Sequence, residues 1–381
     1  MPPLGLYVHI PFCSAICHYC NFNRGLFDGP LKRRFVDAVC AEILAAPGRH
    51  GRLAGRPPAD TIFFGGGTPS LLESAEVAAI LEACRTAFDI DPGAEVTLEV
   101  NPESAVEPFL SAVRAAGVTR LSVGVQSFRQ DELQRLGRVH DVPQARLAVA
   151  SARAAGFENL SLDLMMWLPA QQVGHWMETV EAAAALGPEH LSLYMLELYP
   201  NAPLREEMAR AGWSLAPDDD AAEMYEAAMA RLEELGYRQY EISNVCRPGR
   251  ESRHNLKYWT DGEWLGFGPG AHSTLAGVRW KNVGATGEYV ARVSAGSPLD
   301  VERRELTADE RWQEALITGL RLADGISMAA MAARYGVDLD ARFGDDLRRF
   351  EEAGAVARDG DRLRLTRRGM LVANEVLRVF I

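Results

Sequence analysis

The chain has 381 residues, of which 48% are hydrophobic and 24% are charged, and its formal net charge at pH 7 is −12. This length predicts two or three domains with a buried core, and the negative charge argues against a general nucleic-acid binder, whose affinity rests on basic patches. No apolar run is long enough to span a bilayer, and the N-terminus MPPLGLYVHIPF lacks the features of a signal peptide, so we expect a cytoplasmic protein.

Short apolar runs alternate with segments rich in Ala, Leu and Glu over the first two hundred residues. We expect strands at 4–10, 61–64, 95–100, 120–125, 159–166 and 190–198. We expect helices between them, near 31–46, 71–87, 104–116, 129–136, 143–155 and 173–186. Repeated β/α units with continuous apolar strands predict a parallel sheet covered by helices, either as an open sheet or as a partial barrel.

Polar and glycine residues lie in or directly after the carboxyl-terminal part of the predicted strands, where parallel α/β folds gather their functional groups. These residues are the cysteine segment after the first strand, GGGTPS (65–70) after the second, and then Glu99, Asn101, Gln126, Asp163, Tyr194 and Glu197. A buried core needs none of these polar groups. We therefore predict that they share one pocket at this edge of the sheet.

Three of the six cysteines, Cys13, Cys17 and Cys20, lie within PFCSAICHYCNF (11–22). Offsets of four and three also suit one helical face, where the cysteines would form a small apolar stripe. Pro11 and the preceding strand argue against a long helix, and no second cysteine pair completes a four-ligand zinc site. Three thiolates can instead hold three irons of a cubane cluster and leave the fourth iron open. The remaining cysteines are scattered, and we expect buried small side chains at Cys40, Cys84 and Cys246.

The spacing C-x3-C-x2-C followed by an aromatic residue, with GGGTP one strand later, resembles the radical S-adenosylmethionine (SAM) superfamily. The stretches YVHIPFC, FFGGGTPSLL, SVGVQSF, YEISN, HNLKYW and GFGPGAHS together resemble its oxygen-independent coproporphyrinogen oxidase branch, over almost the whole chain. The resemblance implies an α/β fold with a partial (β/α)6 barrel over residues 1–210, a β-containing extension over 211–300, and a C-terminal winged-helix-like domain over 301–381.

Several local features refine this division of the chain. SAGSPLDVERREL, near 295–305, changes from Gly, Ser and Pro to charged residues and is the expected boundary. The winged helix would comprise helices near 308–322, 327–335 and 340–353, a hairpin at 355–366 and a last helix. A helix at 218–235, which begins with three aspartates, is expected to be a solvated outer helix.

The resemblance also implies roles for individual residues. Cys13, Cys17 and Cys20 would bind a [4Fe-4S] cluster, and SAM would chelate its open iron and undergo reductive cleavage to methionine and a 5′-deoxyadenosyl radical. The positions that match the family's SAM contacts are Tyr7, Tyr19, Gly66, Gly67, Thr68, Glu99, Gln126, Arg138 and Asp163.

Some of these residues have ordinary structural alternatives. Arg138 could be a surface cation at a helix end, Gln126 a turn residue, and Tyr7 a core aromatic with its hydroxyl at the rim. One position departs from the family pattern, because Trp167 in DLMMWLPAQ replaces the usual glycine. This departure leaves the local turn geometry open.

Two sub-branches share these motifs. The oxidases carry an extra N-terminal segment and a further cysteine two residues after the third, whereas this chain begins twelve residues before Cys13 and has Phe22 at that position. HNLKYW (254–259) matches the HN-x-x-YW motif of the haem chaperones, in which His254 would bind the haem iron. The alternative is that His254 is a loop histidine bonded to the main chain. His272 and His9 are second candidates for the haem ligand.

The resemblance thus implies a haem chaperone with a [4Fe-4S] cluster and SAM, without coproporphyrinogen oxidase activity. Its partners would be haem as cargo, apo-haemoproteins, including those of the respiratory membrane, and an electron donor for the cluster. Its location would be cytoplasmic, or peripheral at the inner face of the membrane. Two other functions stay open: oxidative decarboxylation of coproporphyrinogen III or another radical reaction, and regulation through the winged helix. The charge balance predicts that this domain is a docking module or a lid and does not read a DNA sequence.

Overall fold

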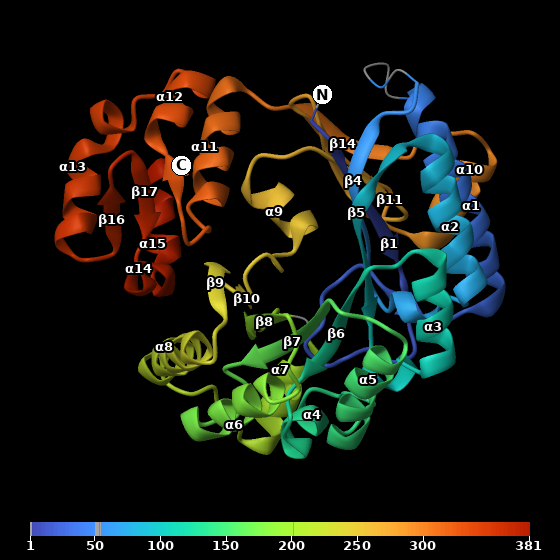
Figure 1. Ribbon diagram of the computed structural model, residues 1–381, viewed down its shortest axis with the longest axis horizontal. Coiled ribbons are helices and arrows are strands. Elements are labelled where there is room, and N and C mark those ends of the chain that lie inside the picture. The colour runs from blue at the N-terminus through green and yellow to red at the C-terminus, as the bar shows by residue number, and fades with distance from the viewer. Residues whose placement is uncertain (1, 50–52, 54, 201) are drawn as a thin grey trace.

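The computed structural model describes residues 2–49, 53, 55–200 and 202–381. Six parallel strands lie side by side in chain order at the centre of a twelve-stranded sheet (Figure 1). They are β1 (Leu4–Ile10), β4 (Pro58–Gly66), β5 (Asp89–Val100), β6 (Arg120–Gln126), β7 (Leu160–Met166) and β8 (His190–Met195). All six overlap the predicted strands. β4 is longer than predicted at both ends, β5 begins at Asp89 and not at residue 95, and β8 ends at Met195 and not at residue 198.

Helices cover the outer face of this sheet (Figure 1). They are α1 (Gly29–Arg49), α2 (Ser74–Ala87), α3 (Glu107–Ala116), α4 (Gln130–Arg135), α5 (Val142–Ala154) and α6 (Val173–Ala184). Helix α2 begins later than predicted because Pro69–Leu71 form a short 3₁₀ helix. Side chains alternate along each strand, so Leu121 and Val123 of β6 are fully buried in the main core while Ser122 faces the concave side. The result is a partial barrel with an apolar outer layer and a polar interior, as predicted.

The segment that follows the barrel supplies both edges of the sheet. On one side β10 (Asn244–Cys246) pairs with β8, and β9 (Arg238–Glu241) pairs with β10. On the other side β11 (Trp264–Phe267) runs parallel to β1, followed by β12 (His272–Leu275), β13 (Val278–Asn282) and β14 (Asp300–Glu305). The charged half of the expected boundary segment is therefore strand β14.

Four helices accompany these strands: α7 (Pro203–Ala211), α8 (Asp218–Glu234), α9 (Arg253–Trp259) and α10 (Thr286–Ser294). The prediction that α8 is a solvated helix is wrong for one of its faces, since Met224, Tyr225 and Met229 are buried and the helix packs against α6. Helix α9 packs against β4 and against α11 (Ala308–Gly319), and Figure 1 shows it between the sheet and the C-terminal helices.

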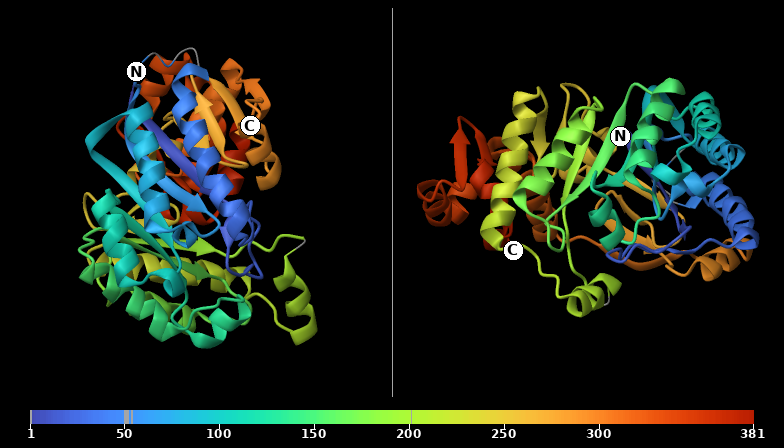
Figure 2. Two further views of the ribbon diagram at one scale, coloured as in Figure 1. Left: turned by 90° about the vertical axis from the view of Figure 1, so that its right-hand side faces the viewer. Right: turned by 90° about the horizontal axis from the view of Figure 1, so that it is seen from below.

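The C-terminal unit lies at one end of the molecule (Figure 2). After α11 it contains β15 (Ile326–Ser327), α12 (Met328–Tyr335), α13 (Leu339–Glu352), β16 (Val356–Asp359), β17 (Arg362–Leu365), α14 (Arg367–Leu371) and α15 (Ala373–Leu377). The three helices α11, α12 and α13 and the hairpin β16–β17 match the predicted winged helix, and β15 adds a third strand to the hairpin. The predicted last helix is divided into the two short helices α14 and α15.

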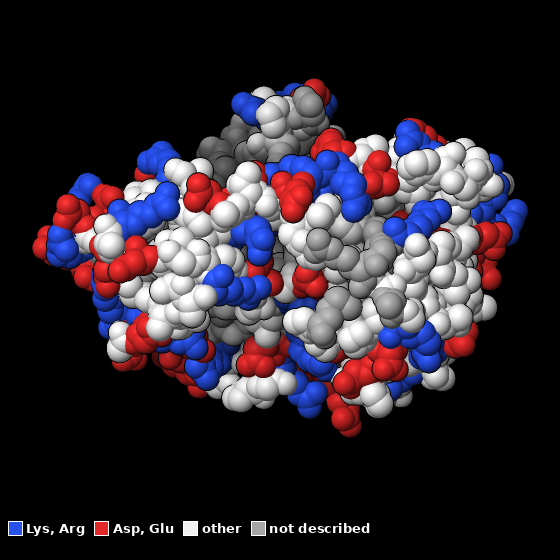
Figure 3. Space-filling model, turned by 90° about the horizontal axis from the view of Figure 1, so that it is seen from above, with Lys and Arg blue, Asp and Glu red and all other residues white. Residues whose placement is uncertain are grey.

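Two features of the structure match what the composition predicts: the distribution of charge on the surface and the length and polarity of the helices. Figure 3 shows Lys and Arg intermixed with Asp and Glu over one face, which in its described part lacks the continuous basic patch of a nucleic-acid binder. Within the described residues, each helix is either too short or too polar to cross a membrane.

Candidate functional site

A cavity of about 380 Å³ opens at the carboxyl ends of the parallel strands. The strand-end residues that the sequence singles out share this cavity, which confirms the prediction of one pocket. The predicted residues in its lining are Cys13, Cys17, Tyr19, Cys20, Gly66, Gly67, Thr68, Glu99, Asn101, Gln126, Arg138, Asp163, Tyr194 and Glu197. Their individual roles remain predictions.

The cysteine segment forms a closed loop at the mouth of the cavity. The two-residue strand β2 (Phe12–Cys13) pairs in parallel with β3 (Gly25–Leu26), and the amide of Gly25 donates to the carbonyl of Pro11 at 2.7 Å. No helix forms between Cys13 and Gly25. The alternative of an apolar stripe on a helix is therefore wrong, because Pro11 and the strand pairing impose a loop.

The three thiols lie in an environment that suits a bound metal cluster. Burial raises the pKa of the Cys13 and Cys20 thiols, and the positive charge of Arg24 opposes this rise. A thiol with a raised pKa needs a metal or a cation to become a thiolate ligand. Among the described residues, no three His, Cys, Asp or Glu side chains converge on one ion. A cluster in which each thiolate binds its own iron does not require such convergence.

The glycine turn after β4 lies directly against the start of the cysteine segment. The amide of Gly67 donates to the carbonyl of Ile10 at 2.8 Å, and the amide of Thr68 donates to the carbonyl of Phe12 at 2.8 Å. A Cβ on residue 67 would lie 2.6 Å from the Phe12 oxygen and 2.9 Å from the Ile10 oxygen. Only glycine allows this approach of the two main chains, so the turn exposes backbone and not side chain toward the cavity.

Two carboxyl groups, those of Glu99 and Asp163, face the cavity without an ion-pair partner among the described residues. Glu99 accepts from the Gly66 amide at 3.1 Å, and Asp163 accepts from Ser122 Oγ at 3.0 Å. Burial, followed by the charge of Asp163, raises the pKa of Glu99 to about 8, and burial raises the pKa of Asp163. Such a pair favours a ligand that brings hydroxyl donors or positive charge.

Arg138 links the cysteine segment to the ends of two strands. Its Nη1 donates to Cys17 Sγ at 3.4 Å, and its Nη2 donates to Asn101 Oδ1 and to the Gly124 carbonyl, each at 2.8 Å. The alternative of a surface cation at a helix end is therefore wrong. Gln126 leaves the extended conformation at the end of β6, with φ of 67°. The backbone of Gln126 is therefore that of a turn residue, as the alternative proposed.

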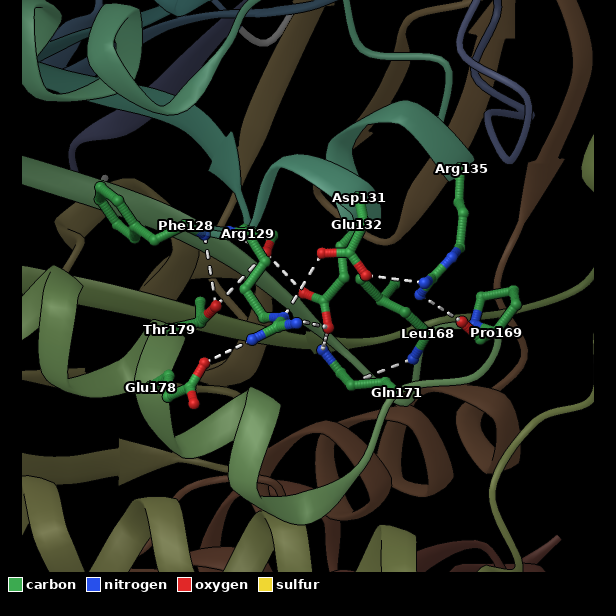
Figure 4. Close-up of polar contacts among 11 residues, drawn as sticks. Phe128, Arg129, Asp131, Glu132, Arg135, Leu168, Pro169, Gln171, Glu178 and Thr179 are labelled. Carbon is green, nitrogen blue, oxygen red and sulfur yellow. Dashed lines mark hydrogen bonds and ion pairs between the residues drawn. The ribbon is translucent and has the colours of Figure 1, made fainter.

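A network of hydrogen bonds fixes the loop that follows Gln126 (Figure 4). The carboxylate of the fully buried Glu132 accepts from Ser127 Oγ at 2.5 Å and from Gln171 Nε2 at 3.1 Å. Gln171 Oε1 in turn accepts from the Leu168 amide at 3.2 Å. Because Ser127 follows β6 and Gln171 follows β7, the network joins the two loops at one side of the cavity.

Trp167 keeps the turn after β7 in a conformation that glycine prefers. Its φ is 61°, in the left-handed region, and its indole Nε1 donates to the Ala216 carbonyl at 2.8 Å. The hydrogen bond offsets part of the cost of placing a bulky residue in this region. The turn at Trp167 is thus in the left-handed region, and a hydrogen bond from the indole fixes its side chain.

Neither Tyr7, which was predicted to contact SAM, nor His254 is among the described residues that line the cavity, and their rings lie 6.4 Å apart between centroids. His254 is 1% exposed, its Nδ1 bonds to Thr61 Oγ1 at 2.8 Å, and its Nε2 bonds to Tyr258 Oη at 2.9 Å. Burial, with the nearby charge of Lys257, lowers the pKa of His254 to about 3, so the ring is neutral. The alternative of a loop histidine is wrong, since His254 lies on α9 and its ring bonds to side chains.

The second candidates for haem differ in exposure. His272 is exposed on β12, whereas His9 is buried in β1, where its Nδ1 bonds to Tyr7 Oη at 3.2 Å. Among the other cysteines, Cys84 and Cys246 are buried as predicted, while Cys40 is only partly buried.

Sequence reasoning missed Arg24 and gave no role to Asn101. Arg24 lines the cavity and donates to the carbonyls of Cys20 and Phe22, but a lone arginine after a cysteine segment has no signature in one sequence. Asn101 accepts from Arg138 and donates to Thr68 Oγ1 at 3.2 Å. Its position directly after β5 was the signal that it belongs to the cavity.

Comparisons with known proteins agree with this geometry. Family models match over residues 7–183 for the radical SAM superfamily and over residues 306–372 for the HemN C-terminal domain. The chain is 35% identical to the heme chaperone HemW of Bacillus subtilis, over 98% of each chain. It is 31% identical to the heme chaperone HemW of Escherichia coli, over 100% of this chain and 99% of the relative.

The fold also has a solved counterpart. The chain is similar to coproporphyrinogen III oxidase (HemN) from Escherichia coli, a radical SAM enzyme, with a TM-score of 0.86 and 24% identity over 99% of this chain and 90% of that chain. At this identity the likeness shows the fold alone. It confirms the predicted fold class.

Proposed function

Since the chain belongs to the radical SAM superfamily and, within it, to the family of the heme chaperone HemW, we propose that it binds haem and transfers it to apo-haemoproteins in the cytoplasm or at the inner face of the membrane. The superfamily implies a [4Fe-4S] cluster and SAM. The observation that carries the proposal is the sequence similarity to these chaperones over the full chain. It is combined with one cavity that contains three thiols, a glycine turn and two carboxyl groups.

The residues of the cavity fit a cluster and SAM. Cys13, Cys17 and Cys20 would hold three irons, while Arg24 and Arg138 would offset the negative charge of the thiolates. The glycine turn would approach the methionine end of SAM, and Glu99 would accept from the ribose hydroxyls. A cluster reduced by an outside electron donor would supply one electron to the sulfonium of SAM. The protein contributes the placement of both and a cavity with limited access to water.

The affinity for SAM is expected to rise with pH up to about 8, because Glu99 is protonated in the free protein below its raised pKa. A ligand that brings hydroxyl donors and positive charge binds the ionised carboxylate of Glu99 better than the protonated acid. Binding below this pH therefore releases a proton, and the association constant for SAM rises by at most about tenfold per pH unit. Calorimetric titration of the reconstituted protein with SAM at several pH values measures this slope. Glu99→Gln should flatten it, and an equal slope in both proteins would remove Glu99 from the SAM site.

Exposed apolar side chains at the mouth of the cavity support haem as the cargo. Phe22, Met195 and Tyr199 line the cavity and are exposed, and Phe27 and Leu26 lie exposed on the same cysteine loop. A rim of this composition suits a flat apolar macrocycle.

His254 remains the proposed ligand of the haem iron, but only a rearranged α9 could present it. Both ring nitrogens are hydrogen-bonded in the described conformation, so iron binding must break the contact with Thr61 or with Tyr258. His254→Ala is expected to weaken haem binding by at least about tenfold, as loss of one ligand bond would cause. His190→Ala is the matched control for a spectroscopic haem titration, because His190 is also fully buried, lies outside the motif and has both ring nitrogens bonded to hydroxyl groups, those of Ser161 and Tyr240. Equal affinities in both variants would exclude His254 and leave the rim of the cavity as the binding surface.

One assay separates the chaperone from the oxidase. The reconstituted protein, incubated without oxygen with SAM, a reductant and coproporphyrinogen III, is expected to form no protoporphyrinogen IX. The haem-loaded protein is expected to transfer haem to apomyoglobin, followed by the Soret band. Rapid formation of protoporphyrinogen IX would contradict the proposal and favour the oxidase. Tight binding to duplex DNA that is insensitive to salt would favour the regulator.

A further inference from the structure

The motif GFGPGAHS contributes no side chain to the described lining of the cavity, yet its glycine turn contacts the cysteine segment. The turn connects β11 to β12 and comprises residues 268–271. Asn23, three residues after Cys20, donates through Nδ2 to the Pro269 carbonyl at 2.9 Å and to the Gly284 carbonyl at 3.0 Å. A segment of the extension is thus bonded directly to the arm of the loop that follows the third cysteine.

The glycines of this turn are required by the contact. Gly270 has φ of 73°, and a Cβ there would lie 2.5 Å from Asn23 Nδ2. Gly268 has φ of 94°, and a Cβ there would lie 2.5 Å from the carbonyl oxygen of His9. A side chain at residue 268 would therefore push the turn away from β1, and one at residue 270 would displace the Asn23 amide from its hydrogen bonds; both would also be strained at these positive φ values.

A buried carboxyl group supports the turn from behind. Glu42 of α1 accepts from the Gly268 amide at 2.9 Å, from Tyr289 Oη at 2.6 Å and from Asn282 Nδ2 at 2.6 Å. Asn282 Nδ2 also donates to the Gly268 carbonyl at 2.9 Å. Helices α1 and α10 and strand β13 therefore fix the position of the turn through one buried network, which no predicted role of the cavity uses.

The main chain of Asn23 is held as well as its side chain. His9 Nε2 lies 2.6 Å from the Asn23 carbonyl oxygen, so it is the protonated nitrogen and donates, while Nδ1 accepts from Tyr7 Oη. Asn23 is consequently bonded to β1 on one side and to the extension on the other. These contacts fix the end of the loop that follows the third cysteine.

We propose that Asn23 and the turn 268–271 form a clamp that positions the cysteine segment, so that cluster retention depends on the extension. Asn23 is a positioning residue, because it acts through the loop that carries Cys20 and does not line the cavity in the described residues. The proposal rests on the proposed function, since a cluster is what the segment would hold. It gives the motif GFGPGAHS and the buried Glu42 a shared role.

The test compares Asn23→Ala and Asn23→Asp with the wild type. Aspartate keeps the size of the side chain but cannot donate to the two carbonyls. Thr366→Ala is the matched control. The Thr366 hydroxyl also bonds to main-chain groups, donating to the Gly354 carbonyl at 2.6 Å and accepting from the Gly369 amide at 2.9 Å, but it lies in the C-terminal unit.

The first readout is the rate at which iodoacetamide alkylates Cys17 and Cys20 in the metal-free protein, mapped by mass spectrometry. Loss of two hydrogen bonds is expected to raise this rate on the order of tenfold in both Asn23 variants and not in Thr366→Ala. The second readout is the half-life of the reconstituted cluster in air, which is expected to fall by a similar factor. The electron paramagnetic resonance spectrum of the reduced cluster is expected to broaden as the loop gains conformations.

The outcomes separate this proposal from the proposed function. A wild type that assembles no cluster contradicts the proposed function, and the alkylation rates then still decide whether the clamp exists. A wild type with a cluster, and Asn23 variants with wild-type alkylation rates and half-lives, would overturn the clamp. If circular dichroism shows that Asn23→Ala does not fold, Asn23→Asp decides alone.

Discussion

Replacing Cys13, Cys17 and Cys20 together with serine is expected to abolish the iron–sulfur cluster and to leave the fold in place. Serine is close to cysteine in size, but its hard hydroxyl oxygen is a poor ligand for cluster iron. Cys17 and Cys20 lie in the loop at the cavity, Cys13 ends the two-residue strand β2, and none of the three belongs to the two hydrophobic cores of the described residues. Anaerobic reconstitution followed by iron and sulfide analysis should give about four of each per wild-type chain and none in the variant.

Cys40→Ser is the matched control for this experiment. Cys40 is partly buried on α1 and does not line the cavity in the described residues. The control is expected to retain its full iron and sulfide content. Equal iron in the triple variant and in the wild type would contradict the assignment of the cysteine segment.

Gly67→Ala is expected to have the second largest effect, through a clash between two main chains. The added Cβ would lie 2.6 Å from the Phe12 carbonyl oxygen and 3.1 Å from Cys13 Sγ, and backbone cannot move aside as a flexible side chain can. Overpacking of this kind costs about 1–3 kcal/mol. If the turn moves, the approach to SAM and the position of Cys13 change together. We expect SAM affinity to fall about tenfold or more and the cluster to be lost faster.

The matched control is Gly174→Ala, at a helical glycine where a Cβ would meet no atom within 4 Å. Equilibrium dialysis with labelled SAM on both reconstituted variants measures the difference. Wild-type affinity in Gly67→Ala would show that the turn is not a close contact of SAM.

The parallel strands could be predicted because their apolar runs are continuous. Leu160, Leu162 and Leu164 are fully buried under the helices, and the intervening positions of β7 carry the polar residues of the interior. Since the carboxyl ends of parallel strands meet at one edge, the place of each polar residue in the chain was enough to predict one cavity.

Contacts between distant segments could not be predicted in the same way. Residue 254 is separated from Thr61 by almost two hundred positions, and only the packing of α9 against β4 shows that its ring Nδ1 bonds to the Thr61 hydroxyl. The contact of Asn23 with Pro269 spans an even longer separation of 246 positions. Periodicity describes one element at a time, so it carries no information on which elements meet. The buried face of α8 could not be predicted for the same reason. The acidic first turn of the helix indicated a solvated element, and nothing in the sequence indicated that α8 packs against α6.

The most direct test of the account is the electron paramagnetic resonance spectrum of the reduced, reconstituted protein, recorded with and without SAM. If one iron is left open by the three cysteines and faces the cavity, saturating SAM should shift the g values of the cluster, and the triple serine variant should show no cluster signal. A cluster signal that saturating SAM leaves unchanged would contradict the shared site of cluster and SAM.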